Sequence, residues 1–318
     1  MDSWRNKMTK PALVVIVGPT AVGKTKTSIE VAKAFHGEVI NSDSMQIYQR
    51  MDIGTAKVKP EEMEGVPHHL LDICSPEEDY SVADYQKDAQ QVIDDLHNRN
   101  KLPVMVGGTG LYVRSVTHNY NFNDAISDPS YRQELEEFVN NYGVDALHSR
   151  LQEIDPERAR QIHPNNVRRV FRALEVFRAT GSTVSDRYAE ESPYNLAVIG
   201  LTMDRERLYE RINLRVEMMV QEGLFDEVKK LYESNVRDTQ SIQAIGYKEI
   251  YRYFDGEYSS ETAIEQLKRN SRRYAKRQLT WFKHQMDVEW FDMTNGKLDE
   301  KIPSILRFVA GKLDLKSN

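Results

Sequence analysis

The sequence predicts an α/β protein whose core is a parallel β-sheet. Short apolar or β-branched runs alternate with longer segments of helical periodicity, which is the pattern of strand–helix–strand units. One run leads through a glycine-containing loop into a helix, and a long middle segment carries helix signals without a strand. The expected strands lie at 12–17, 38–41, 69–73, 102–106 and 196–202, and the helices that alternate with them include 81–99 and 204–220.

The first strand, Ala12 to Val17, is followed by a complete G-x-x-x-x-G-K-[ST] loop and a helical stretch that reaches Phe35. Glycines let backbone N–H groups converge on phosphate oxygens, a lysine adds a positive charge, and a Thr hydroxyl is a ligand for Mg²⁺. The flanking strand and helix favour a phosphate site (a P-loop) over a simple turn. The predicted diphosphate site comprises Gly18, Pro19, Thr20, Ala21, Val22, Gly23, Lys24 and Thr25, with Thr25 as the Mg²⁺ ligand.

The acid that holds Mg²⁺ in most nucleotide hydrolases is missing from its usual place. The strand at 102–106 runs into Gly107-Gly108-Thr109-Gly110 instead of an Asp. Asp43 follows the strand at 38–41, where the carboxyl edge of a parallel sheet binds ligands. An Asp between two serines is also a common cap or turn residue, but its place beside the phosphate loop favours chemistry.

The predicted domains are a discontinuous core, residues 1–120 and 196–318, and an inserted helical lobe at 121–195. Helix starts in the lobe are expected near Asp128-Pro129, Asp155-Pro156 and His163-Pro164-Asn165. The first apolar run is too short for a membrane span or a signal peptide, so we expect a cytoplasmic protein. The single cysteine, Cys74, excludes an internal disulfide and a multi-cysteine zinc site.

A formal net charge of −6 argues against a nucleic-acid partner unless the positive charges are gathered. They gather between Ile264 and Met286, where seven Lys and Arg residues occupy neighbouring helix faces. Such a stripe is often only a solvated surface, but in an acidic protein it favours RNA contact. The residues proposed to contact RNA there are Arg272, Arg273, Lys276, Arg277, Trp281 and Lys283.

Two further arginine groups lie on predicted helices. Arg168, Arg169 and Arg172 fall on 166–180, in the helical lobe. Arg207, Arg211 and Arg215 recur every fourth residue behind the expected N-cap Asp204, so they share one face. The second group is suited either to a diphosphate or to ion pairs with the glutamates of its own helix.

Several of these blocks together resemble the bacterial-type tRNA dimethylallyltransferase family, also called IPP transferases. They are the phosphate loop, Asp43 to Gln46, Met51 to Lys57, Gly107 to Tyr112, Gln243 to Glu249 and Tyr274 to Phe282. They run in the family's order over nearly the whole chain. Val22 departs from the pattern, because the family usually has Ser at that position of the loop.

The resemblance implies a P-loop NTPase-like core and transfer of a dimethylallyl group from its diphosphate to the exocyclic amine of the adenine 3′ of a tRNA anticodon. An Arg of the 211 to 215 stretch would assist Lys24 at the diphosphate, with Arg215 preferred. Asp43 would orient and deprotonate the amine, beside Thr109. The tRNA contacts would include Ser44, Met45, Gln46, Gln243, Gly246, Tyr247 and Lys248.

The resemblance further implies that the helical lobe and the basic C-terminal helices surround the anticodon stem-loop, and we expect a monomer. The main alternative is a small-molecule or nucleoside kinase, which shares a P-loop, Mg²⁺, a parallel sheet and a helical lid. A nucleotide-gated RNA-binding switch is a second alternative, but the sequence has no N-K-x-D motif for guanine. The acid-free strand end at Gly107 and the long basic helix argue against a kinase.

Overall fold

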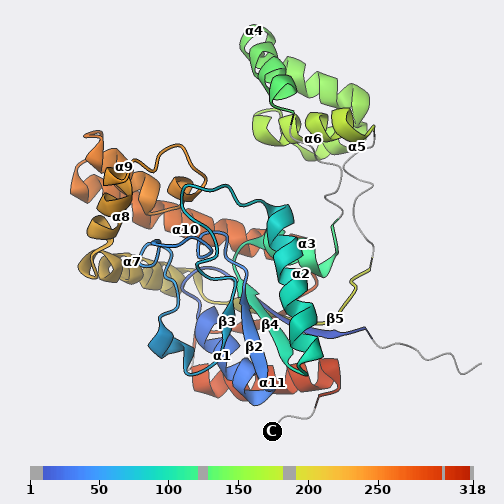
Figure 1. The fold of residues 1–318 in the computed structure, drawn as a ribbon, viewed down its shortest axis with the longest axis vertical. Coiled ribbons are helices and arrows are strands. Elements are labelled where there is room, and N and C mark those ends of the chain that lie inside the picture. Colours follow the sequence, from blue (N-terminus) through green and yellow to red (C-terminus); the bar gives the residue numbers. More distant parts are fainter. Residues whose placement is uncertain (1–9, 121–127, 182–190, 296–297, 316–318) are drawn as a thin grey trace, which may run out of the picture. The chain divides into compact units, whose positions relative to one another are not determined.

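The computed structural model describes residues 10–120, 128–181, 191–295 and 298–315, and the chain divides into two compact units. The larger unit combines the chain up to Thr117 with the chain from Ser192 onwards, and the smaller unit is His118–Glu191. The predicted lobe, 121–195, thus differs from the observed unit by a few residues at each boundary. Figure 1 shows the sheet and its helices in the larger unit and a separate group of helices in the smaller one.

The larger unit is built on a six-stranded sheet in the order β3-β2-β4-β1-β5-β6, and every strand pair is parallel. β1 lies between β4 and β5, and β4 separates β1 from β2. The carboxyl ends of β1, β2 and β4 therefore meet at one edge of the sheet. The strands are β1 Ala12–Val17, β2 Gly37–Asn41, β3 His68–His69, β4 Leu102–Gly107, β5 Asn195–Thr202 and β6 Glu289–Asp292.

Helices cover both faces of this sheet, because alternate residues of each strand point to opposite sides. Val14 and Ile16 of β1 pack into a core shared with α1 (Lys24–Ala34) and α11 (Leu298–Leu313). Leu13 and Val15 pack into the other core, which includes α2, α3 and α7 to α10. The bounds of these last helices are α2 Val82–Asn98, α3 Gly110–Thr117, α7 Arg205–Gln221, α8 Leu224–Glu233, α9 Tyr247–Phe254 and α10 Ser260–Gln285. Two short 3₁₀ helices, η1 Pro60–Met63 and η3 Ser241–Gln243, lie in the connections.

The smaller unit has its own apolar core, formed by Leu135, Leu147, Leu151, Phe171 and Leu174. Its helices are α4 Pro129–Ile154, interrupted at Gly143, α5 Pro156–Gln161 and α6 Val167–Thr180. Two of the predicted starts are confirmed, since Asp128 and Asp155 cap α4 and α5 with their side chains. The third helix begins at Val167, just after the predicted start, and ends at Gly181 as expected. No strand occurs among residues 128–181, which agrees with the all-helical prediction.

The sheet differs from the prediction at both of its edges. The expected strand at 69–73 is wrong beyond His69, because Leu70 and Asp72 have left-handed backbones, with φ of 61° and 55°. Lys57 holds Asp72 in this turn through an ion pair of 2.5 Å. β6 was not predicted, because its four residues have neither clear alternation nor a long apolar run.

Candidate active site

The phosphate loop lies between β1 and α1, at the carboxyl edge of the sheet. Gly18 and Gly23 have φ of 148° and 111°, which an L side chain rarely adopts. A Cβ on Gly18 would also lie 2.5 Å from the backbone oxygen of Leu201. The side chain of Val22 is 1% exposed and packs in the core, so this departure from the family pattern points away from the phosphate site.

The side chain of Lys24 folds back onto the start of the phosphate loop. Its Nζ donates to the backbone oxygens of Gly18 and Pro19 at 3.1 and 2.8 Å. Burial lowers the pKa of Lys24 to about 8, an effect that the charge of Asp43 opposes and the charge of Arg215 reinforces. Asp43 and Arg215 therefore both lie within electrostatic reach of Lys24. An incoming diphosphate would offer the ammonium group a better partner than the neutral carbonyl groups that hold it here.

Arg215 is the arginine of α7 whose charge acts on Lys24. Its side chain retains solvent exposure, yet burial of the guanidinium lowers its pKa, and the neighbouring charge of Arg211 lowers it further. Both arginines are exposed, and the charge of Arg215 contributes to lowering the pKa of Lys24. The predicted N-cap Asp204 is confirmed by its bonds to the backbone N–H groups of Glu206 and Arg207. This electrostatic effect is consistent with the preference for Arg215 over Arg211 as the partner of Lys24.

Asp43 follows β2 in a short, fully bonded turn. Its backbone N–H donates to Asn41 Oδ1 at 3.1 Å, and its own Oδ1 accepts from the backbone N–H of Met45 at 2.9 Å. Burial raises the pKa of Asp43, while the bond from Met45 and the charge of Lys24 pull it back down. A desolvated carboxylate held in one orientation is suited to accept a proton.

Thr109 joins the Asp43 turn to the glycine-rich loop after β4. Its Oγ1 accepts from the backbone N–H of Ser44 at 3.0 Å and donates to Ser44 Oγ at 3.2 Å. A Cβ on Gly107 would lie 2.1 Å from the backbone oxygen of Ser42, so only glycine allows the two loops to approach this closely. The structure thus brings together Asp43 and Thr109, two residues that are far apart in the sequence.

Tyr274 of α10 belongs to this site and was not assigned a role from the sequence. Burial raises its pKa, and the negative charge of Asp43 raises it further. Hydrogen bonds with Thr109 and Gln278 act in the opposite direction. The helical periodicity placed Tyr274 on the apolar face of α10, so only its position in a block that resembles the family could have indicated a site residue.

Gln46 and Tyr247 pack against the segment Met51 to Lys57, and Gly246 caps the helix that carries Tyr247. Gln46 Nε2 donates to the backbone oxygens of Thr55 and Ala56 at 3.0 and 3.2 Å. Gly246 is the N-cap of α9, with a φ of 106°, and its N–H donates to a glutamate of that helix. Tyr247 is fully buried, and a Cβ on Gly54 would lie 2.5 Å from its ring.

Glu227 organises the same segment. Its carboxylate accepts the backbone N–H groups of Asp52, Ile53 and Gly54 at 2.9, 2.8 and 3.0 Å. It also accepts the hydroxyl of Tyr247 at 2.6 Å. The ring and the hydroxyl of Tyr247, a predicted tRNA contact, are therefore both occupied inside the protein in this structure.

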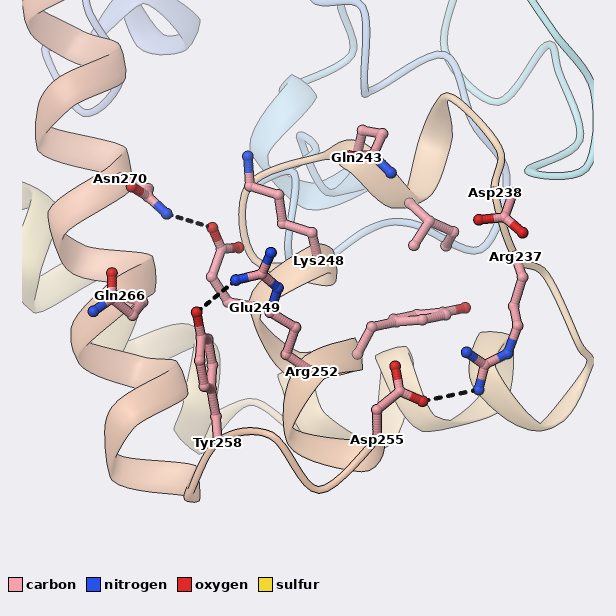
Figure 2. Close-up of a pocket in the computed structure, with 12 residues that line it drawn as sticks. Arg237, Asp238, Gln243, Lys248, Glu249, Arg252, Asp255, Tyr258, Gln266 and Asn270 are labelled. Carbon is pink, nitrogen blue, oxygen red and sulfur yellow. Dashed lines mark hydrogen bonds and ion pairs between the residues drawn. The ribbon is translucent and has the colours of Figure 1, made fainter. Parts of the chain in front are cut away.

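Gln243 and Lys248 line a polar cavity of about 510 Å³ beside α9 and α10 (Figure 2). The cavity contains three hydrogen-bonded or ionic pairs: Arg237 with Asp255, Arg252 with Tyr258, and Asn270 with Glu249. In Figure 2 both amide and charged groups border the opening. Such a lining is suited to a polar ligand rather than an apolar one.

The basic residues of α10 divide into exposed and tethered groups. Arg272 is tethered, since its Nη1 donates to Asn213 Oδ1 of α7 at 2.6 Å. Lys268 pairs with Glu217 of α7 at 3.0 Å. Trp281 is half-buried, and a Cβ on Gly110 would lie 2.2 Å from its ring. The exposed group, which we call the α10 basic face, is Arg269, Arg273, Lys276, Arg277 and Lys283.

The smaller unit presents a basic surface of its own on α6. Arg168, Arg169 and Arg172 are all exposed. Glu175 of the same helix pairs with Arg132 of α4 at 2.8 Å and lies 4.0 Å from Arg172. Arg172 thus lies closer to this carboxylate than Arg168 and Arg169 do.

The described residues contain no group of three or more His, Cys, Asp or Glu side chains arranged to hold a metal ion. This does not conflict with Mg²⁺ at the phosphate loop, since that ion is usually bound by one or two protein oxygens together with phosphate oxygens and water. Thr25 is exposed in the first turn of α1, as such a ligand must be. Cys74 is buried and free, and burial raises its pKa to about 11. Among the described helices, none is long and apolar enough to cross a membrane.

The parallel sheet, the phosphate loop with its two cations and the adjoining carboxylate define a P-loop α/β protein built to bind a phosphorylated group beside a second substrate. The family model described as IPP transferase matches residues 46–285. The chain belongs to this family.

Curated relatives match almost end to end. A tRNA dimethylallyltransferase of Halalkalibacterium halodurans is 61% identical over 312 residues, which cover 97% of this chain and 99% of the relative. One of Bacillus cytotoxicus is 57% identical over 309 residues, covering 96% and 97%.

Solved structures agree with the fold. The full-length tRNA isopentenylpyrophosphate transferase from Bacillus halodurans has a TM-score of 0.75 at 60% identity, and the match covers 96% of this chain and 97% of that one. A eukaryotic dimethylallyltransferase acting on tRNA has a TM-score of 0.80 at 31% identity, covering 96% and 79%. The P-loop α/β fold predicted from the sequence is confirmed.

Proposed function

We propose that this chain transfers a dimethylallyl group from dimethylallyl diphosphate to the exocyclic amine of the adenine 3′-adjacent to the anticodon in tRNA, with release of diphosphate. Family membership supports the reaction class. The observation that carries the proposal is that the phosphate loop with Lys24 and the turn with Asp43 follow strands of one parallel sheet and so lie at the same edge, where the charge of Arg215 also acts on Lys24. Two cations suit a leaving diphosphate, and one desolvated carboxylate suits a nucleophile that must lose a proton.

The donor end of the site stabilises the departing negative charge. The backbone N–H groups in the first turn of α1 have no partners within the helix, so they are available to phosphate oxygens. Lys24 and Arg215 add two positive charges where the carbon–oxygen bond of the donor breaks. Mg²⁺, held by Thr25 and by the diphosphate, would neutralise further charge when bound.

The acceptor end orients the amine and removes its proton. The exocyclic amine of adenine is a weak nucleophile that becomes positively charged on alkylation, so a nearby carboxylate favours the reaction. Asp43 takes this role, and Thr109 and Ser44 form the wall beside it. Because a base stacked in an anticodon loop cannot reach such a recess, the adenine must be extruded from the loop.

The RNA backbone would be held by exposed cations on both units. The α10 basic face, together with Arg168, Arg169 and Arg172 of α6, supplies these charges in a protein whose net charge is −6. Gln243 and Lys248 add polar groups at the mouth of their cavity. We expect the anticodon stem-loop to be the part of the tRNA that is bound, by a monomeric enzyme in the cytoplasm.

Incubation with Mg²⁺, dimethylallyl diphosphate and unmodified tRNA, followed by nucleoside mass spectrometry, tests the proposal. The expected product is a prenylated adenosine next to the anticodon. A parallel reaction supplies ATP in place of the prenyl donor. Phosphoryl transfer from ATP without any prenyl adduct would contradict the proposal and favour a kinase.

A further inference from the structure

The side chain of Gln278 connects the two loops that define the site. It lies on α10 and is 5% exposed. Its Oε1 accepts from the backbone N–H of Thr20 in the phosphate loop at 3.0 Å, and its Nε2 donates to the backbone oxygen of Gly108 at 3.0 Å. One amide group therefore spans loops that follow two neighbouring strands, β1 and β4.

The glycine-rich loop is shaped to admit this side chain. A Cβ on Gly108 would lie 2.0 Å from Gln278 Nε2, so any other residue there would displace the amide. One turn further along α10, the ring of Trp281 fills the space that a Cβ on Gly110 would need. α10 thus lies directly against the loop that carries Thr109, at two successive points.

The same face of α10 also reaches the acceptor end. Tyr274, four residues before Gln278, interacts with Thr109 and responds to the charge of Asp43. The helix consequently contacts the donor end through Gln278 and the acceptor end through Tyr274. Nothing in Gln278 itself is acidic, basic or nucleophilic, which separates its role from those of Lys24 and Asp43.

We propose that Gln278 is a positioning residue that fixes the distance between the phosphate loop and the Thr109 loop. This inference rests on the proposed prenyl transfer. By engaging the N–H of Thr20, early in the loop, the amide fixes the loop's path while the later N–H groups in the first turn of α1 stay available for diphosphate. The electrophilic carbon of the donor and the attacking amine must be about 3–3.5 Å apart and aligned, and a misplacement of about 1 Å can cost 10²-fold in rate.

The decisive variants are Gln278→Met, which keeps the length of the side chain without its hydrogen bonds, and Gln278→Glu. We expect Gln278→Met to lower kcat by about 10- to 100-fold, with little change in KM for either substrate, because each half-site stays intact. Gln285→Met, at the exposed end of the same helix, is the matched control and should retain wild-type kcat. A Gln278→Met enzyme with wild-type kcat, or one whose loss lies wholly in KM, would overturn the inference.

Gln278→Glu provides a rescue test that a loss of folding would not reproduce. The ionised carboxylate accepts from Thr20 but repels the oxygen of Gly108, whereas the protonated acid can both accept and donate, as the amide does. The ratio of its kcat to that of the wild type should therefore rise as the pH falls, while the ratio for Gln278→Met stays flat. A flat ratio for both variants would contradict the proposed pair of bonds.

Amide hydrogen exchange separates this inference from the prenyl-transfer proposal. Exchange in a peptide covering Gly18 to Lys24 should speed up in Gln278→Met and stay unchanged in Gln285→Met, whatever reaction the enzyme catalyses. Unchanged exchange in Gln278→Met would overturn the positioning role, and an inactive wild type with the expected exchange pattern would overturn the reaction alone.

Discussion

The proposed donor end and the surfaces proposed to bind RNA are built in opposite ways. The donor end is compact: it consists of one loop of eight residues at the sheet edge, its half-buried lysine and one arginine of α7 whose charge acts on that lysine. The cations proposed to bind RNA are exposed, are spread over α10 and α6, and belong to two different units. Single changes at the donor end or beside Asp43 should therefore have large effects on chemistry, whereas single changes on the basic faces should have small effects on affinity.

The largest effect is expected from Asp43→Asn. The amide keeps an acceptor for the N–H of Met45 but cannot take up a proton. Because a general base contributes about 10²- to 10⁴-fold, kcat should fall by that order while tRNA affinity stays nearly intact. Single-turnover prenylation and a tRNA binding titration measure the two quantities. Unchanged turnover would remove Asp43 from the mechanism, and Asp43→Ala, which also loses the turn contact, should be at least as impaired.

The pH dependence of kcat/KM for dimethylallyl diphosphate should follow the protonation state of Lys24. Its pKa is lowered to about 8 by burial, and only the protonated form carries the charge that attracts diphosphate. As the pH rises through this value the charge is lost, so kcat/KM for dimethylallyl diphosphate should fall about tenfold per pH unit. Bound diphosphate stabilises the ammonium, so the fall in kcat should begin at a higher pH.

Lys24→Arg is the matched variant for the pH profile, because the guanidinium stays charged throughout this range. The fall in kcat/KM near pH 8 should be absent from the pH profile of this variant, whatever its overall activity. A fall that persists unchanged would assign the titration to a different group.

A smaller effect, on stability alone, is expected from Tyr247→Phe. The change removes a hydroxyl that donates to Glu227, although three backbone N–H groups still satisfy that carboxylate. Hydrogen bonds to charged groups contribute about 1.5–3 kcal/mol, and we expect a loss near the lower limit. Urea unfolding measures the free energy of unfolding, and tRNA affinity should not change. Weaker tRNA binding without a change in stability would restore the predicted RNA contact of Tyr247.

The smallest effect is expected from replacing single arginines of α10, and it should distinguish Arg273 from its neighbour Arg272. Arg273 is exposed, whereas Arg272 is bonded to Asn213. Replacing Arg273 with Gln should reduce the slope of log affinity for tRNA against log salt by nearly one. The same change at Arg272 should alter the slope less. Equal slopes for the two variants, measured over a salt titration, would contradict the division of the basic residues into exposed and tethered groups.

This pair also shows what the sequence could and could not predict. The phosphate loop is local, so its strand, glycines, lysine and helix could be read directly from consecutive residues. The position of Asp43 followed from the general rule for parallel sheets. Helical periodicity gathered the positive charges of α10, but it does not reveal which face packs against α7, so Arg272 and Arg273 were given the same role.

Long-range partners account for the other differences. Tyr247 was predicted to contact tRNA, and only the fold brings Glu227 and Gly54 against it. Gln278 is an ordinary polar residue in a basic helix, and its two partners are 258 and 170 residues away in the chain. Roles that depend on such contacts have no local signal in the sequence.

The most direct test of the separation between donor and acceptor groups is to titrate dimethylallyl diphosphate and tRNA separately into Lys24→Met and Asp43→Asn. Loss of a charge-assisted contact of about 1.5–3 kcal/mol should weaken binding of the diphosphate to Lys24→Met by about 10- to 100-fold, with tRNA affinity retained. Asp43→Asn should bind both substrates nearly as well as the wild type and fail only in turnover. Equal affinity of Lys24→Met and the wild type for the diphosphate would contradict the account.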